Sequence, residues 1–119
     1  ATLIVARCMR QYQWDEALSR RVLTAYKQFL TLKNEWRDWD AQALAPCHLV
    51  DLMWHAHVSD LNNYLHDCML LCEGHVVDRN PDLVMDRAAY KERAATTRDA
   101  LASRFGKYYD AELWMDELD

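Results

Sequence analysis

Apolar side chains recur along the first third of the chain with the spacing of an amphipathic helix. They lie 4, 4, 3, 4, 3 and 4 residues apart: Trp14, Leu18, Val22, Ala25, Phe29, Leu32 and Trp36. An α-helix turns once in about 3.6 residues, so this spacing gathers the seven side chains on one face. We therefore predict a long helix from about Asp15 to about Asn34. The segment 35–45 is predicted as a connector that folds back on the core.

Two shorter helices are predicted to follow the connector. Pro46 suits the first turn of the second helix, because its missing N–H would be unpaired there. That helix reaches residue 57 or 58, and its apolar face should bury Trp54. Asp60 is a good N-cap for a third helix over 61–73, which Gly74 ends. The apolar face of this third helix is formed by Leu61, Leu65, Cys68 and Cys72.

A fourth helix and a short tail complete the predicted secondary structure. Asp82 can cap a helix that runs through Leu101 to Phe105, and Gly106 closes it. The tail, 108–119, carries apolar residues and is predicted to pack back on the core as a short helix.

The composition favours an all-α fold. Only two Gly and two Pro occur, whereas a β-sandwich or barrel needs turns at short intervals and draws heavily on both residues. Gly74 and Gly106 stand alone, which excludes a glycine-rich phosphate loop. We predict a single compact bundle of about four helices with a short C-terminal helical tail, spanning residues 1–119 as one domain.

The charge pattern excludes some partners. The net charge is −5 and no basic stripe is present, so we expect no nucleic-acid binding. No stretch approaches the roughly 20 apolar residues of a membrane span. A partner should therefore be a small molecule or another protein.

The cysteines and the chain start bear on the compartment. A chain of this length builds a core without disulfides, so we expect reduced thiols and an intracellular, cytoplasmic setting. Thr2 to Ala6 is too short for a signal-peptide core. The chain opens at Ala1 without Met. We expect that it has been trimmed and that any targeting segment is not visible.

Candidate chemistry is concentrated in one stretch. Four of the five histidines fall between Cys47 and Cys72. Imidazole and thiolate are preferred ligands of zinc and similar divalent metals. On a regular helix, however, His55 and His57 point roughly 160–200° apart. One metal ion can bind both histidines only if the helix ends or distorts near Ala56. Asp67 or Cys68 would then complete the site.

Other interpretations of the same residues remain open. Asp51 and His55, one turn apart, could bind a metal by themselves. Alternatively, the Asp51 carboxylate could orient His55 as a catalytic imidazole. His57 could instead hold haem or another flat cofactor between helices. The non-catalytic alternative is a protein-interaction or structural module, in which these residues form a buried hydrogen-bond network that fixes the helix packing.

Several motifs resemble those of the glycine-rich domain-containing protein-like family. They are VDLMWHAH at 50–57, Tyr64, Asp67-Cys68, Gly74 and Asn80-Pro81, which follow a family pattern of the form VDxxWHxH…YxxDC…G…HNP. LTAYKQFL at 23–30, RFG at 104–106 and Trp114 are similar to flanking family segments. The matching positions are Asp51, Trp54, His55, His57, Tyr64, Asp67 and Cys68.

The resemblance implies a site without supplying a reaction, because the family has no established biochemical activity. This chain departs from the pattern at Asp78 and Arg79, where members often carry histidines, and it lacks the glycine-rich tail. Clustered ligand types and the resemblance together predict a divalent metal, most simply zinc. The predicted ligands are Asp51, His55, His57, Asp67 and Cys68.

Overall fold

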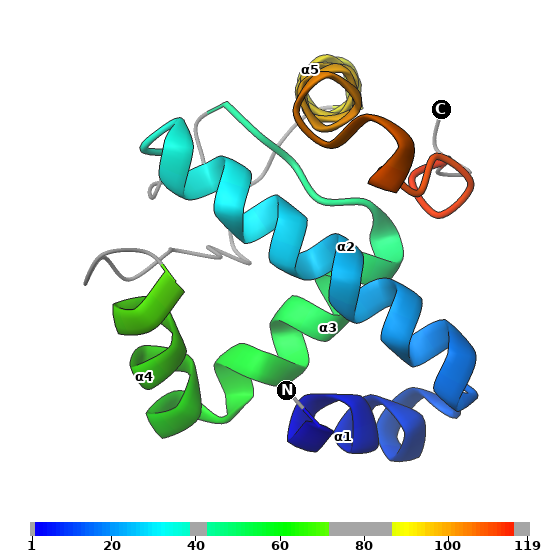
Figure 1. Cartoon of the computed structure of the whole chain (residues 1–119), viewed down its shortest axis with the longest axis vertical. Coiled ribbons are helices and arrows are strands. Elements are labelled where there is room, and N and C mark those ends of the chain that lie inside the picture. Colours follow the sequence, from blue (N-terminus) through cyan, green and yellow to red (C-terminus); the bar gives the residue numbers. More distant parts are fainter. Residues whose placement is uncertain (1, 39–42, 72–86, 116–119) are drawn as a thin grey trace.

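The long amphipathic helix predicted from the apolar stripe is the central element of the fold (Figure 1). A computed structural model describes residues 2–38, 43–71 and 87–115. In it, α2 (Glu16–Glu35) begins at Asp15, whose carboxylate accepts a hydrogen bond of 2.7 Å from the Leu18 backbone N–H. The stripe is buried at four of its positions: Val22, Ala25, Phe29 and Leu32. The predicted bounds and buried face of this helix are confirmed.

A helix that the periodicity did not predict precedes it. α1 (Thr2–Tyr12) buries Val5 and Cys8, which share one face of the helix. The Arg7 guanidinium donates to the Ala56 carbonyl at 3.1 Å, and the Tyr12 hydroxyl donates to the Leu52 carbonyl at 2.9 Å. Both acceptors lie in the next-but-one helix, so α1 is attached to it as well as to α2.

α3 (His48–Ser59) and α4 (Leu61–Leu71) meet at a sharp turn at Asp60. α3 begins two residues after Pro46, with Cys47 as its N-cap, so Pro46 is outside the helix and not in its first turn. α3 is continuous through Ala56, so the end or distortion that a metal shared by His55 and His57 would require there is absent. The reversal comes four residues later, where the Tyr64 N–H donates to the Asp60 carbonyl.

The buried face of α4 also differs from the prediction. Tyr64 and Cys68 are buried in the core, whereas Leu65 is 37% exposed. The pattern of aliphatic residues therefore indicated a face that is rotated from the true one. Gly74, Cys72 and the predicted start of the last helix at Asp82 lie outside the described residues.

α5 (Arg87–Phe105) packs across α2 and ends, as predicted, at Gly106, which adopts a left-handed φ of +54°. Gly106 opens a short 3₁₀ turn, η1 (Gly106–Tyr108). On the inner side of α5, the Thr97 hydroxyl accepts a hydrogen bond of 2.9 Å from the Ala45 N–H. This bond joins α5 to the end of the connector.

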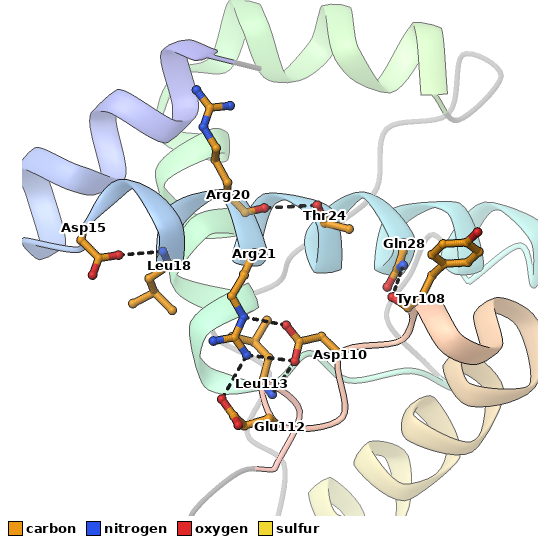
Figure 2. Close-up of polar contacts among 10 residues, drawn as sticks. All are labelled: Asp15, Leu18, Arg20, Arg21, Thr24, Gln28, Tyr108, Asp110, Glu112 and Leu113. Carbon is orange, nitrogen blue, oxygen red and sulfur yellow. Dashed lines mark hydrogen bonds and ion pairs between the residues drawn. The ribbon is translucent and has the colours of Figure 1, made fainter.

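The segment after η1 folds back on α2, as Figure 2 shows. Arg21 makes a forked pair with the Asp110 carboxylate at 2.9 and 3.0 Å and reaches Glu112 at 3.2 Å. Gln28 donates to the Tyr108 carbonyl at 3.0 Å. Trp114 is thereby buried against Phe29, although residues 109–115 form turns and not the predicted helix.

The core confirms the prediction for Trp54, which is 2% exposed and meets the Phe29 ring edge to face at 5.5 Å. The connector does return to the core at Leu44 and Ala45, but Trp36 is 46% exposed. Cys8, Cys47 and Cys68 are buried. The predicted all-α fold class is confirmed. Among the described helices, none has the length and apolar character that a membrane span needs.

Candidate functional site

His57 is the centre of the candidate site. It lies near the end of α3 on the face turned toward α2, and only 8% of the residue is exposed. Its Nδ1 is 2.8 Å from the Tyr26 hydroxyl oxygen, and its Nε2 is 2.7 Å from Asp67 Oδ2. A carboxylate only accepts, so in the neutral ring Nε2–H donates to Asp67 and Nδ1 accepts from Tyr26. Both ring nitrogens are thus paired with protein groups.

Two aromatic side chains pack against the imidazole. The rings of Tyr26 and Tyr64 stand edge-on to it at 87°, with centroid distances of 5.6 and 4.9 Å. The Tyr64 hydroxyl accepts a hydrogen bond of 3.1 Å from Trp54 Nε1. We call Tyr26, Trp54, His57, Tyr64 and Asp67 the His57 network. It connects α2, α3 and α4 through polar bonds that run from the core to the half-exposed carboxylate of Asp67.

Three members of the His57 network contribute to the wall of a pocket of about 400 Å³. Tyr26, His57 and Asp67 line this pocket, together with Asp60 and Asn63 at the start of α4. The Asp67 side chain is 41% exposed and the His57 side chain only 10%. The carboxylate therefore lies nearer the mouth of the pocket, and the imidazole lies deeper.

A family model described as glycine-rich domain-containing protein-like matches residues 5–67, more than half of the chain. The chain belongs to this family. No curated protein and no solved structure matches it. The matched segment begins in α1 and ends at Asp67, so the whole His57 network lies within the glycine-rich domain-containing protein-like region.

The five predicted site residues, of which Cys68 lies just beyond the matched region, fall into two groups. His57 and Asp67 are hydrogen-bonded, and Cys68 is buried beside Asp67. His55 is exposed and Asp51 is half-buried. Because α3 is regular, these two residues share a side of the helix that His57 does not. The geometry needed for one metal to take both histidines is thus not provided by α3.

The donor set bears directly on metal binding. Structural zinc sites usually have four protein ligands and catalytic ones three. Within 2–38, 43–71 and 87–115, no group of three or more His, Cys, Asp or Glu side chains is arranged to hold a metal ion. Cys72 and His75 lie outside these ranges.

Sequence reasoning missed Tyr26 as a site residue. It lies in the LTAYKQFL segment of the first long helix and was given no role in the site, yet it is 2% exposed and supplies the hydroxyl that meets His57. A buried tyrosine usually needs a hydrogen-bond partner, so a Tyr on an apolar helical face was the available signal. The partner is 31 residues away, and its identity could not be read from local spacing.

Proposed function

We propose that this domain is a non-catalytic binding module that holds a small molecule in the pocket beside His57. The observation that carries the proposal is the hydrogen-bonded His57 network in the wall of an open pocket of about 400 Å³. Small-molecule sites usually have volumes of roughly 300–1,000 Å³, mostly apolar walls and a few placed polar groups. The pocket has a volume in this range, and its lining combines aliphatic side chains with polar and charged ones.

The order of the imidazole supports the binding proposal. Both nitrogens of His57 are already hydrogen-bonded to Tyr26 and Asp67. A satisfied buried network rigidifies its surroundings, and a rigid wall lowers the entropy cost of ligand binding. His57 therefore acts as an ordered part of the pocket wall.

The experiment is a fragment screen followed by amide chemical-shift perturbation in NMR. We expect bound fragments to shift resonances of pocket residues such as Ile4, Leu23 and Asn63. Leu23→Trp, which fills the pocket from α2, should abolish these shifts and keep the helical circular dichroism spectrum. Leu65→Trp places the same side chain on the outer side of α4 and should leave binding intact.

Two results would contradict the proposal. One is a screen in which no fragment moves the pocket resonances. The other is binding that survives Leu23→Trp unchanged, because the fragments would then bind elsewhere. Tyr26→Phe adds a finer test: it removes the partner of His57 Nδ1 and should weaken binding without filling the pocket.

Divalent-metal binding is a second proposal, with zinc as the simplest ion. The observation that favours it is the pairing of His57 Nε2 and Asp67 Oδ2, two suitable donors 2.7 Å apart at a solvent-reached pocket. Zinc would have to replace their hydrogen bond and take its remaining ligands from solvent or from other groups.

Metal analysis of protein purified without a histidine tag, before and after zinc loading, tests the second proposal. If zinc binds here, one equivalent should be present, and His57→Gln and Asp67→Asn should each lose it. His55→Gln is the matched control, since His55 is exposed on another side of α3. A zinc content well below one equivalent after loading would reject metal binding and leave the small-molecule proposal standing.

A further inference from the structure

The pocket beside His57 has an uneven distribution of charge and apolar surface. From this we infer that its ligand is a small amphipathic anion, with a compact apolar body and one carboxylate or phosphate group. The inference rests on the proposed small-molecule binding and adds the chemical class of the ligand.

The apolar part of the lining comes from three helices. It consists of five aliphatic side chains: Leu3, Ile4, Leu23, Leu30 and Leu70. Leu3 on α1 and Leu70 on α4 are 74% and 71% exposed, which is high for large aliphatic side chains. A ligand with an apolar body would remove part of this surface from water, and such burial contributes roughly 25 cal/mol per Å².

The cationic part of the lining comes from α1 and α2. Arg7, Arg10 and Lys27 all line the pocket, in a chain whose net charge is −5. Arg7 donates to the Ala56 carbonyl, which orients its guanidinium without neutralising it. Arg10 and Lys27 are exposed and have no ion-pair or hydrogen-bond partner for their side chains among the described residues.

Three arginines elsewhere in the fold differ in this respect. Their guanidinium groups are paired with carboxylates: Arg20 with Glu16, Arg21 with Asp110, and Arg104 with Glu35. Arg10 and Lys27 therefore keep their charge available for a ligand. The pocket that they line also has aliphatic side chains in its wall. A nearby low-dielectric surface strengthens the attraction of such charges for an anion.

The carboxylates of the lining come from other elements than the cations. Asp60 and Asp67 belong to the α3–α4 turn and α4, and both already accept hydrogen bonds: Asp60 from Asn63 at 2.7 Å and Asp67 from His57 at 2.7 Å. The carboxylates of the lining are therefore already used within the protein, whereas Arg10 and Lys27 are not used by any described part of the chain. We place the head group of the ligand near Arg10 and Lys27.

Four probes with the same eight-carbon chain and different head groups test the charge of the ligand: octanoate, octyl phosphate, octanol and octylamine. Each is used below its micelle concentration or its solubility limit. Calorimetry should show octanoate or octyl phosphate binding about 3- to 10-fold more tightly than octanol, as expected for partly exposed charge pairs. The comparison between the two anions tells a carboxylate ligand from a phosphate ligand. Octylamine should bind most weakly.

The variants Arg10→Gln and Lys27→Gln test the assigned contacts. Each should weaken binding of the preferred anion by about 3-fold or more and leave octanol unchanged. Lys91→Gln removes the same charge from the exposed surface of α5 and serves as the matched control. Added salt should weaken anion binding and spare octanol, since screening acts on the charged pairs.

The outcomes that overturn this inference differ from those that overturn the binding function. Equal affinity for octanoate and octanol would reject the anionic class, while the pocket would still bind a small molecule. Preference for octylamine would also reject it and would assign the ligand to the Asp60 and Asp67 side. If fragments bind the pocket but none of the four probes does, the amphipathic anion is wrong and the binding function remains.

Discussion

At the scale of single residues, Trp54 joins the packing of the core to the geometry of the site. Its ring packs against Phe29, and its indole N–H donates to the Tyr64 hydroxyl. Tyr64 in turn stands edge-on to His57. One side chain therefore fills the centre of the protein and also positions a ring that holds the imidazole. A change at this residue should affect both stability and the pocket.

We expect Trp54→Ala to lower the free energy of unfolding by about 3–5 kcal/mol, because removal of a buried Trp leaves a cavity. Urea denaturation followed by circular dichroism measures this change. Trp36→Ala is the control: Trp36 is 46% exposed, and its removal should change stability by about 0.5 kcal/mol or less. Equal effects of the two variants would contradict the assigned packing.

Cys8 is a second residue whose burial has a measurable consequence. Burial raises the pKa of the Cys8 thiol to about 11, against a smaller lowering effect of the Arg7 charge. In the unfolded chain a thiol ionises with a pKa of roughly 8.5. Between about pH 8.5 and pH 11 the Cys8 thiol is therefore deprotonated in the unfolded chain and still protonated in the folded chain. The contribution of Cys8 to stability is therefore complete below about pH 8.5 and is lost as the pH rises toward 11.

The test compares the wild-type protein with Cys8→Ala at several alkaline pH values. Other groups also titrate in this range, but their effects are shared by both proteins. The stability difference between the two should shrink steadily as the pH rises above about 8.5. A difference that is constant across this range would show that the Cys8 pKa is not raised by folding.

At the scale of elements, a buried ion pair determines how the chain leaves α2. Lys33 and Asp38 are 0% and 4% exposed at their side chains, and Lys33 Nζ is 3.0 Å from Asp38 Oδ2. The Asp38 carboxylate also accepts the backbone N–H groups of Ala43 and Leu44, each at 3.0 Å. This cluster ties the end of α2 to the connector. The connector then leads into α3 and the site.

Lys33→Met should lower the free energy of unfolding by about 3–5 kcal/mol, because it leaves a buried carboxylate without its cation. Thermal and urea denaturation both measure this loss. Lys91→Met, at an exposed position of α5, removes the same charge and should change stability by about 0.5 kcal/mol or less. If Lys33→Met leaves the free energy of unfolding unchanged, methionine replaces the lysine without loss of stability and the prediction is wrong.

At the scale of the whole molecule, α2 is the element on which the other parts assemble. α1, α3 and α4 pack on it around the pocket, while α5 and the C-terminal segment pack elsewhere along it (Figure 1). The described residues fill a body of 33 × 30 × 29 Å. Two contacts join the C-terminal segment to this body. Arg21 of α2 pairs with Asp110, and Trp114 is buried in the core.

The joint between Arg21 and the C-terminal segment should depend on pH. The hydrogen bond from Arg21 lowers the pKa of the Asp110 carboxyl, and burial opposes this effect less strongly. A carboxyl with a lowered pKa stabilises the folded state above its ordinary range near pH 4, and this contribution is lost as the pH falls through the lowered value. The pair therefore supports folding at neutral pH and loses its effect in acid.

Arg21→Gln should consequently reduce the unfolding midpoint modestly at neutral pH, and the difference from wild type should vanish in strong acid. Thermal denaturation at a series of pH values measures both effects. Arg20→Gln breaks only a pair within α2 and should leave the packing of the C-terminal segment unchanged. A midpoint difference for Arg21→Gln that grows on acidification would contradict this account.

The parts of the fold that were predicted correctly depend on local regularities. The stripe from Trp14 to Leu32 and the cap at Asp15 determine α2, because side chains 3 and 4 residues apart must share a helical face. Gly106 closes α5 through its own backbone conformation. α1 was missed although Ile4, Val5, Cys8 and Tyr12 are spaced to share one helical face, because Thr2 to Ala6 was considered only as a signal-peptide core.

The sequence by itself determined the helical class, the main helix and the stretch that carries the site. Only the tertiary structure decided that His57 and not His55 belongs to the network, since α3 continues past Ala56 and Tyr26 approaches from another helix. The pocket could likewise not be predicted from the sequence. Its charges come from α1 and α2 and its carboxylates from the α3–α4 turn and α4. Helical periodicity is local, whereas the angles at which helices cross depend on how all their side chains pack together.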